Sequence, residues 1–520
     1  MERRTLLKIG AASVPALFVT SALAGCGSSS GSGDGGGTPT ITMLVLGDKP
    51  TNGRLEAMLE KLNAVLTEKA SAILALYYVE WADWQTQYNV QLLSGDGSID
   101  LIGTASDWLF AWDNASKGAF LELEEPLLQE NAPKTWAQVD ESGDWDLTKL
   151  DDVIYFVPED NYTQYTNHGF FYRGDWAAEA GFKDGTITKF EDFTTYFQWV
   201  KDNQSEAYPW DVSGSNAAVL DGYIAGHGDF QTIQGLSAGN YFPLHTTESN
   251  PYKVTSWLLE GDLLQEAAEI AKEWNDLGVW REDALNYDGD TRELFYAGLS
   301  GADQHHTQTF LTGIVFNMTA KQEGSDPKFF YWGSENGNFF KDLKTHGAMA
   351  VSATSSNPEK SLAVYDLLRN DEECYRLINF GIEDTDYVVT EDGKLDFPTG
   401  YDPSTDGLGA NFWYGRMDDY ELDRVTDADY KWDYYAELDK VAKVYPYETL
   451  VIDQNAFAPA LSAVSGVLSE YLPQLQYGKF DDPASAISDM RSKLDGAGLS
   501  DIIASVQEQM DTWKADKGLS

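Results

Sequence analysis

The feature that most constrains this fold is the alternation of strand and helix signals over residues 39–104. Short apolar runs, "ITMLVL" (41–46) and "IDLIGT" (99–104), are typical of buried strands, and a further strand begins within 72–84. Between the strand at 41–46 and the strand that begins within 72–84, residues 53–70 repeat apolar side chains at helical spacing. Strand–helix–strand units pair their strands in parallel through right-handed crossovers. The sequence therefore predicts an α/β fold with an open parallel sheet.

The predicted sheet also indicates where a ligand would bind. Ligands of open α/β sheets bind beyond the carboxyl ends of the strands, which here are "GDKP" (47–50) and "ASDW" (105–108). Strand and helix signals start again at 151–182, and residues 450–520 have mostly helical patterns. A chain of 520 residues has room for two or three domain-sized bodies.

The first 38 residues have the pattern of an export signal followed by a tether. Arg3 and Arg4 precede an apolar stretch that is short and weak beside the about 20 solidly apolar residues of a membrane-spanning helix. "LAGC" (23–26) resembles the lipobox of bacterial lipoproteins, in which the cysteine receives lipid and becomes the first mature residue. "RRTLLK" (3–8) also resembles the twin-arginine export motif.

We therefore expect a lipoprotein signal peptide at 1–25 and a flexible Gly/Ser tether at 26–38. Cys26 would carry the lipid, palmitate included, and hold the exported protein on the outer face of the cell membrane. The twin-arginine route is one interpretation of its export. An uncleaved anchor helix is the alternative to lipidation, and it would also leave the chain on the membrane.

The charge and the cysteines exclude several classes of protein. The chain has 84 acidic and 36 basic residues, for a formal charge of −48, and such a surface repels nucleic-acid backbones. An aromatic content of 13% argues against disorder. Cys26 and Cys374 are its two cysteines, so no internal disulfide framework is available, and Cys374 is predicted to be a small core residue of a helix.

Several segments, in a shared order, resemble bacterial extracellular solute-binding proteins of the family 1 type. "LINFGIEDTDYVVTEDGKLDFP" (377–398) is similar to the LipO-like subgroup of sugar-binding lipoproteins, and 447–513 resembles that subgroup's C-terminal domain of unassigned function. In "LFYAGLSGA", Ser300 or a neighbouring residue stands where the family usually has lysine. The other similar segments are "YNVQLLSGDGSIDLIGT" (88–104), "NASKGAFLELEEPL" (114–127), "KEWNDLGVWREDALNY" (272–287) and "SSNPEKSLAVYDLL" (355–368).

The resemblance implies a two-lobed, periplasmic-binding-protein-like fold of type II, with a hinge and a ligand cleft. Because such chains cross the hinge more than once, we expect lobe 1 at 39–155 with 300–350, and lobe 2 at 156–299 with 351–520, including a helical region at 447–520. The implied function is a substrate-binding lipoprotein of an ABC importer that captures a carbohydrate, an oligosaccharide in particular, by closure of the lobes. Its partners would be the permease subunits, and we expect a monomer.

A sugar receptor needs aromatic platforms for the apolar C–H face of the ring and short polar groups for the hydroxyls. The candidates follow the predicted strand ends, follow the first crossover after "VPED", or lie in segments rich in Trp and Tyr. They are Asp48, Lys49, Trp84, Ser106, Asp107, Trp108, Tyr162, Tyr165, Asn167, Trp210, Tyr223, Trp332 and Trp413.

Motifs of enzymes and metal sites are not found in their required context in the sequence. Its GxSxG matches, at 27–31 in the Gly/Ser tether and at 235–239, are not followed by a predicted helix, and it has no P-loop or HExxH pattern, so no catalytic residue and no cofactor is predicted. His305 and His306 are adjacent and do not converge on one metal from a helix or strand, and the acidic runs 288–293 and 416–424 lack the Gly at position six and the terminal Glu of an EF-hand. We predict a receptor, with a secreted glycoside hydrolase or a receptor for a peptide or another solute as alternatives.

Overall fold

The computed structural model describes residues 37–81, 84–160, 168–214, 218–233, 236, 244–287, 289, 291–341, 343–402 and 405–519. Residues 1–37 and 38–520 are separate units, and all that follows concerns the second unit. The predicted signal peptide, Cys26 and nearly all of the tether lie outside the described residues. Over the part of the chain that is described, no helix has both the length and the apolar character needed to cross a membrane.

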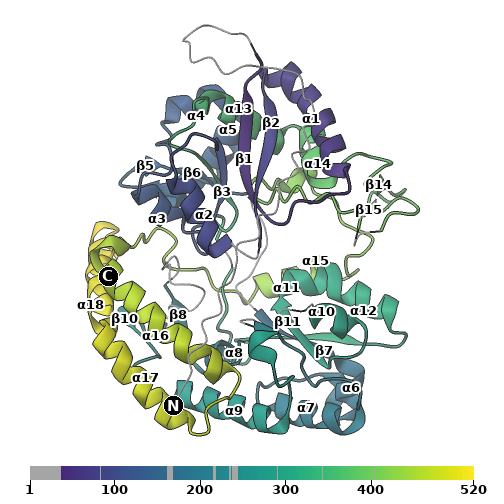
Figure 1. Ribbon diagram of the computed structural model, residues 1–520, viewed down its shortest axis with the longest axis vertical. Helices are drawn as coiled ribbons and strands as arrows, with labels where there is room; N and C mark the ends of the chain where they lie inside the picture. The colour runs from purple at the N-terminus through teal and green to yellow at the C-terminus, as the bar shows by residue number, and fades with distance from the viewer. Residues whose placement is uncertain are drawn as a thin grey trace, which may run out of the picture. The chain divides into compact units, whose positions relative to one another are not determined.

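The first hydrophobic core is built on a five-stranded sheet with the strand order β2-β1-β3-β13-β6 (Figure 1). β1 pairs in parallel with β2 and β3, whereas β13 runs antiparallel to β3 and β6. The predicted α/β fold with parallel strands is thus confirmed, and a strand from a distant part of the chain completes the sheet. The strands are β1 (Thr40–Leu46), β2 (Ile73–Val79), β3 (Leu101–Thr104), β6 (Phe156–Val157) and β13 (Ala348–Val351).

Helices pack around this sheet with their apolar sides inward. α1 buries Leu55, Met58, Leu62 and Leu66, which lie on one helical face, and it ends at Ser71 in the left-handed conformation. Cys374 is buried in the same core, as predicted. The helices are α1 (Arg54–Ala70), α2 (Trp84–Leu93), α3 (Ala111–Ser116), α4 (Glu125–Asn131), α5 (Pro133–Ser142), α13 (Pro358–Asn370) and α14 (Glu372–Phe380).

The second core lies on a three-stranded antiparallel sheet with the order β11-β7-β12. Phe170 of β7 packs among aromatic side chains that include Phe193, Trp210 and Trp274. The strands are β7 (His168–Arg173), β11 (Ala302–His306) and β12 (Pro327–Tyr331), and the helices near them are α6 (Gly174–Glu179), α7 (Asp192–Asn203), α8 (Val219–His227), α9 (Leu263–Leu277), α10 (Thr291–Tyr296), α11 (Thr307–Thr309), α12 (Val315–Lys321) and α15 (Lys431–Asp439).

Three C-terminal helices complete the second core (Figure 1, yellow). α16 and α17 pack against α9, and α18 packs against β10. Their buried positions are apolar and repeat at helical spacing, as with Ile502, Val506 and Met510 of α18. The elements are α16 (Ala458–Gln476), α17 (Pro483–Ala497), α18 (Leu499–Asp516) and the small sheet β8 (Phe230–Thr232), β9 (His245–Thr247) and β10 (Asn250–Thr255).

Short elements occupy the remaining connections. Two-residue strands form the pairs β4 (Lys149–Leu150) with β5 (Val153–Ile154), and β14 (Val388–Val389) with β15 (Leu395–Asp396). Single helical turns lie at Asp144–Thr148, Lys183–Gly185, Ala284–Asn286, Phe310–Ile314, Asp418–Tyr420 and Gln454–Phe457.

The division of the chain between the two cores differs from the expected lobe boundaries. The stretch 300–341 was expected in lobe 1, but β11 and β12 hydrogen-bond to β7 of the second core. Residues 351–382 and 410–414 were expected in lobe 2, but their buried side chains belong to the first core. The order of motifs indicates that the chain crosses between the cores. The positions of the crossings are decided by strand pairing.

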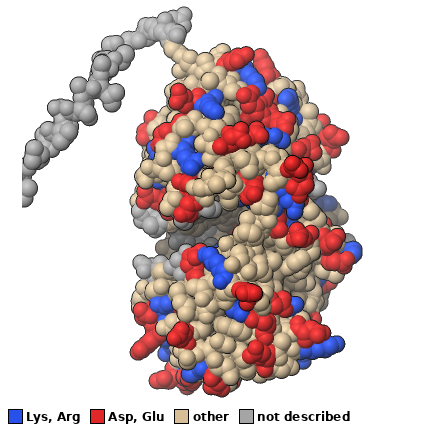
Figure 2. Space-filling model, turned by 90° about the vertical axis from the view of Figure 1, so that its right-hand side faces the viewer, with Lys and Arg blue, Asp and Glu red and all other residues tan. Residues whose placement is uncertain are grey.

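The surface of the second unit carries its charge in mixed form. Acidic side chains are spread over the face shown in Figure 2, with basic side chains among them. This distribution agrees with the excess of acidic residues in the sequence. Interspersed charge of one dominant sign favours solubility.

Candidate functional site

The segment that follows β3 is held by the chain leading into β13. Ser106 Oγ lies 2.6 Å from Thr345 Oγ1, and Asp107 Oδ2 lies 2.7 Å from His346 Nδ1. The Trp108 indole N–H donates to the carbonyl oxygen of His346 at 3.0 Å. Ser106 and Asp107 therefore serve to fix this loop, and Trp108 and His346 are the residues of the group that reach the pocket described next.

A pocket of about 930 Å³ receives side chains from both bodies. Its size lies within the range of sites for small organic ligands. The first body contributes the loops after β3 and β6, the loop before β13, the end of α14 and the segment 408–416, and the second contributes α15, the end of β11 and the residues after it. Among the lining residues are Trp108, Glu159, His346, Asn379, Asn411, Trp413 and Arg416 on one side, and His306, Gln308, Thr312, Asp427, Lys431 and Trp432 on the other.

Tryptophan side chains form two pairs at the first body's side of the pocket. Trp413 stacks on Trp81 with ring centroids 5.7 Å apart and an interplanar angle of 21°. Trp84 meets Trp108 edge to face, also at 5.7 Å. Trp413 and Trp81 are each 42% exposed, so apolar ring surface remains open to a ligand. Such surface suits the C–H face of a sugar ring.

Segment 408–414 crosses the carboxyl ends of β1 and β2. The Tyr78 hydroxyl donates to the Gly409 carbonyl oxygen at 2.7 Å, and the Asn411 amide donates to the Leu46 carbonyl oxygen at 2.9 Å. The Tyr414 ring lies over Gly103 of β3 so closely that a Cβ at Gly103 would fall 2.2 Å from it. These contacts bring Trp413 to the edge of the sheet where ligands of α/β folds bind.

Three histidines lie together on the second body. His305 and His306 of β11 lie beside His168 of β7, with ring centroids 5.2 Å and 5.8 Å from the His168 ring. Burial lowers the pKa of His168 to about 4 and that of His305 to about 3, and it holds the pKa of His306 well below its usual value. His306, which lines the pocket, is therefore neutral at physiological pH and can exchange hydrogen bonds with hydroxyl groups.

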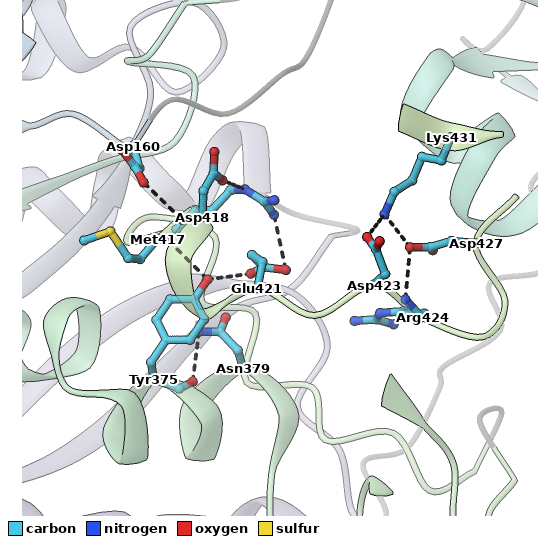
Figure 3. Close-up of polar contacts among 11 residues, drawn as sticks. Asp160, Tyr375, Asn379, Met417, Asp418, Glu421, Asp423, Arg424, Asp427 and Lys431 are labelled. Carbon is cyan, nitrogen blue, oxygen red and sulfur yellow. Dashed lines mark hydrogen bonds and ion pairs between the residues drawn. The ribbon is translucent and has the colours of Figure 1, made fainter. Parts of the chain in front are cut away.

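Figure 3 shows a charged network beneath the pocket at 416–421. Arg416 Nε donates to Asp418 Oδ1 at 2.9 Å, and its Nη1 lies 3.4 Å from Glu421 Oε2. The Tyr375 hydroxyl of α14 donates to the other Glu421 oxygen. Burial raises the pKa of Asp418, with Asp160 and Glu421 adding to the effect. The network gives the guanidinium a fixed place in the pocket wall.

A second network in Figure 3 joins the loop 423–427 to α15. The buried Lys431 ammonium contacts Asp423 and Asp427. In addition, the Trp432 indole N–H donates to Asp423 Oδ2 at 2.8 Å. Burial works to raise the pKa of Asp423, but the hydrogen bonds from Lys431 and Trp432 outweigh it and lower that pKa. Trp432 is thereby oriented while 56% of its surface stays exposed at the pocket.

The described lining carries a net negative charge. Four of its side chains are cationic and six are carboxylates, a net charge of −2. The cations Arg416 and Lys431 are already engaged by carboxylates of the same wall. The ionised side chains are Lys394, Arg416, Arg424 and Lys431 against Glu159, Asp392, Asp418, Glu421, Asp423 and Asp427.

Three predicted site residues are instead part of the second core. Trp210 is fully buried among Phe197, Trp274 and other aromatic side chains. Trp332 packs on Gly222 of α8, and Tyr223 of the same helix is 7% exposed. These assignments were wrong because a large aromatic residue beside a turn signal also suits the core of an aromatic-rich body.

The other predicted residues fall in three groups. Asp48 and Lys49 do follow β1, but they are exposed and outside the described lining, and Lys49 pairs with Glu56 at 3.3 Å. Trp84 reaches the site through its contact with Trp108. Tyr162, Tyr165 and Asn167 lie outside the described residues.

Sequence reasoning missed the residues that approach from segments far apart in the chain. His346 precedes β13, and Trp432 begins α15, two elements for which no ligand-binding role was predicted. Trp81 lies one turn before Trp84 and was passed over although it follows β2 directly. The strand-end rule could have found Trp81, whereas His346 and Trp432 depend on tertiary contacts.

Comparisons with known proteins agree with this geometry. The model of a family described as a domain of unknown function, DUF3502, matches residues 446–515. A Streptococcus pneumoniae serotype 4 protein named carbohydrate ABC transporter substrate-binding protein is 23% identical over 523 residues, which cover 98% of this chain and 99% of that protein.

Solved structures with the same fold include two named for their glycan ligands. The N-glycan transport solute binding protein NgtS from Streptococcus pneumoniae has a TM-score of 0.71 at 19% identity, with 92% of this chain and 100% of that chain covered. The alginate-binding protein AlgQ2, without calcium ion, has a TM-score of 0.67 at 17% identity, with 92% and 99% covered.

The fold is therefore that of the solute-binding proteins of ABC importers, an α/β fold with two lobes. Within that class, the expected resemblance to carbohydrate-binding members is confirmed over nearly the whole chain. The match to DUF3502 falls on the region expected to resemble a C-terminal domain of unassigned function.

Proposed function

We propose that this chain is the extracellular substrate-binding protein of an ABC importer and that it captures a neutral oligosaccharide. The observation that carries the proposal is the pocket, in which exposed faces of Trp413 and Trp432 are combined with neutral His306 and amide side chains. Aromatic faces with a few placed polar groups are the chemistry of a carbohydrate site. The similarity to a carbohydrate transporter's binding protein over 98% of the chain supports the same function.

The charge of the lining favours neutral over anionic sugars. A uronate or a phosphosugar would face a net charge of −2, and two of the four cations in the lining, Arg416 and Lys431, are paired with Asp418, Glu421, Asp423 and Asp427. Like charges in a partly desolvated site disfavour binding. Among similar structures, NgtS has been crystallised with Man1GlcNAc and with Man5GlcNAc. A mannose-containing oligosaccharide is therefore a rational first probe.

Capture would work by closure of the two bodies on the sugar. His306, Lys431 and Trp432 approach from the second body, and Trp108 and Trp413 from the first, so a ligand that touches both sets stabilises the closed arrangement. It does so only through its higher affinity for that arrangement than for an open one. The chain would act as a monomer, without enzymatic turnover, and deliver the sugar to permease subunits.

The lipid on Cys26 would keep the receptor beside its permease on the outer face of the cell membrane. Residues 27–38 would provide a link of about 20 Å if they behave as a Gly/Ser-rich coil. The twin-arginine motif at Arg3–Arg4 is one route by which the chain would be exported. These statements rest on the sequence pattern.

Isothermal titration of the full mature chain tests the function. We expect saturable binding of Man1GlcNAc or of a fructose trisaccharide such as kestose, and at least tenfold weaker binding of an alginate trisaccharide of similar size. Reducing-end release should stay at background over a day. Hydrolysis of any of these sugars would support the glycosidase alternative, and preferential binding of the uronate would contradict the charge argument.

A further inference from the structure

Three potential metal ligands converge on the second body, away from the described lining of the pocket. Glu191, His227 and Glu335 each offer one atom, and these atoms all lie within 4.8 Å of one another. They come from three separate elements: the residue preceding α7, the last residue of α8 and the turn after β12. All three residues are exposed, so water could complete the coordination of an ion held there.

The turn after β12 is positioned by two glycines of α8. Trp332 packs on Gly222, and a Cβ at Gly226 would fall 2.5 Å from Glu335 Oε2. The Asn336 amide donates to the Gly228 carbonyl oxygen, and the Asn338 amide donates to that of Ala225. Because Gly222 and Gly226 have no side chains, the Glu335 carboxylate can approach α8 closely enough to reach His227.

The His227 ring is fixed in the orientation that a metal requires. Its Nδ1 lies 2.8 Å from the Tyr223 carbonyl oxygen, which can only accept, so Nδ1 carries the hydrogen. The ring also stacks on Tyr223, with centroids 3.9 Å apart and an interplanar angle of 14°. In the metal-free ring, Nε2 shares a hydrogen with Glu191 Oε1, and a metal ion would displace this hydrogen to bind the Nε2 lone pair. A backbone carbonyl bonded to the other nitrogen is the usual support of a ligating histidine.

The opposite side of the ring faces carboxylate oxygens. His227 Nε2 lies 2.8 Å from Glu191 Oε1, and two ligands of one tetrahedral Zn²⁺ stand roughly 3.3 Å apart, so only small side-chain movements separate the two arrangements. Burial raises the pKa of Glu335, and Glu191 adds to the effect, while His227 and Lys189 oppose it. Two carboxylates at the carboxyl end of a helix form a place where positive charge is favoured.

We propose that Glu191, His227 and Glu335 bind a divalent transition-metal ion such as Zn²⁺. An imidazole with two carboxylates suits Zn²⁺, whereas Ca²⁺ takes oxygen ligands alone, six to eight of them. With three protein ligands, water completes the coordination. The bound ion would tie the start of α7 and the end of α8 to the turn after β12, stabilising the second body independently of the sugar.

Zinc titration of the full mature chain, stripped of metal with a chelator, tests the proposal. Competition with a chromophoric chelator at pH 7.5 should give one Zn²⁺ per chain, and millimolar Ca²⁺ should not displace it. Glu335→Gln and His227→Asn should each weaken zinc binding by about 100-fold or more, since the supporting residues of a metal site alone cost 10–100-fold. Glu179→Gln, an exposed carboxylate elsewhere on the same body, is the matched control and should change nothing.

A variant at His305 and His306 tests whether the zinc is bound at His227 or at those two histidines. A His305→Gln/His306→Gln variant should keep full zinc affinity if the ion is bound at His227. Loss of zinc in that variant, undiminished binding in both Glu335→Gln and His227→Asn, or no zinc binding by the intact chain would each overturn the proposal. Because no sugar is used, none of these outcomes bears on the proposed transport function.

Discussion

Replacing Trp413 by alanine should weaken oligosaccharide binding about tenfold and leave the fold intact. A tryptophan presents up to about 250 Å² of surface, and with Trp413 at 42% exposed, roughly 100 Å² of it is open. Trp81 covers one face, so a sugar ring on the other would bury about half of the open area. At about 25 cal/mol per Å², burying ~50 Å² is worth about 1.3 kcal/mol, which corresponds to roughly tenfold in Kd.

The cost to folding should be small by comparison. Loss of the Trp81–Trp413 stack removes about 0.5–1.5 kcal/mol, against a stability of about 5–15 kcal/mol for ordinary domains. Urea unfolding monitored by circular dichroism checks this directly. The variant can therefore be assayed as a folded protein.

Calorimetric titration with the sugar that binds the intact chain measures the effect. Tyr77→Ala is the matched control, because Tyr77 is 38% exposed on β2 and outside the described lining of the pocket. It should keep the original Kd. A folded Trp413→Ala variant with unchanged affinity would refute the assignment of this aromatic face to the ligand.

Three further changes test other parts of the structure. The pKa of His168, lowered to about 4 by burial, means that the unfolded chain binds more protons between about pH 6.5 and 4, so His168 alone lowers stability by up to about 3 kcal/mol as the pH drops through that window; urea melts should show the loss, and His168→Gln should reduce it while His305 and His306 maintain the rest. Lys431→Met leaves Asp423 and Asp427 without their cation and should cost about 2–4 kcal/mol by the same melts, whereas an unchanged midpoint would mean that the network is dispensable. Cys26→Ser should move the protein from membrane to soluble fractions of the producing cells, and full membrane retention would favour an anchor helix instead.

The parts of the fold that follow from local pattern were predictable. The period of the apolar residues in 53–70 and the alternation of strand and helix that follows indicated parallel pairing, and β1, β2 and β3 pair in this way. The strand-end rule led to Trp108, which lines the pocket. Ordered resemblances along the chain indicated the two-lobed class, because they draw on many positions at once.

The membership of each lobe and most of the site were not predictable. Residues 300–341, 351–382 and 410–414 lie in the other core than expected, since backbone pairing such as that of β11 with β7 is a long-range choice. Trp210, Trp332 and Trp413 have similar local sequences, each with an aromatic residue near a turn. Trp210 and Trp332 are buried and Trp413 is exposed at the pocket, because different parts of the chain pack against each ring.

The sequence by itself determined the class of fold, the aromatic character of the site and the pattern of an export signal ending at Cys26, because each depends on residues close together in the chain. Tertiary structure alone decided that Trp413 and Trp432 line one pocket and that Glu191, His227 and Glu335 meet. Convergence of side chains far apart in sequence is set by strand pairing and by glycine contacts such as Gly226 with Glu335, which leave no periodic signal in the chain.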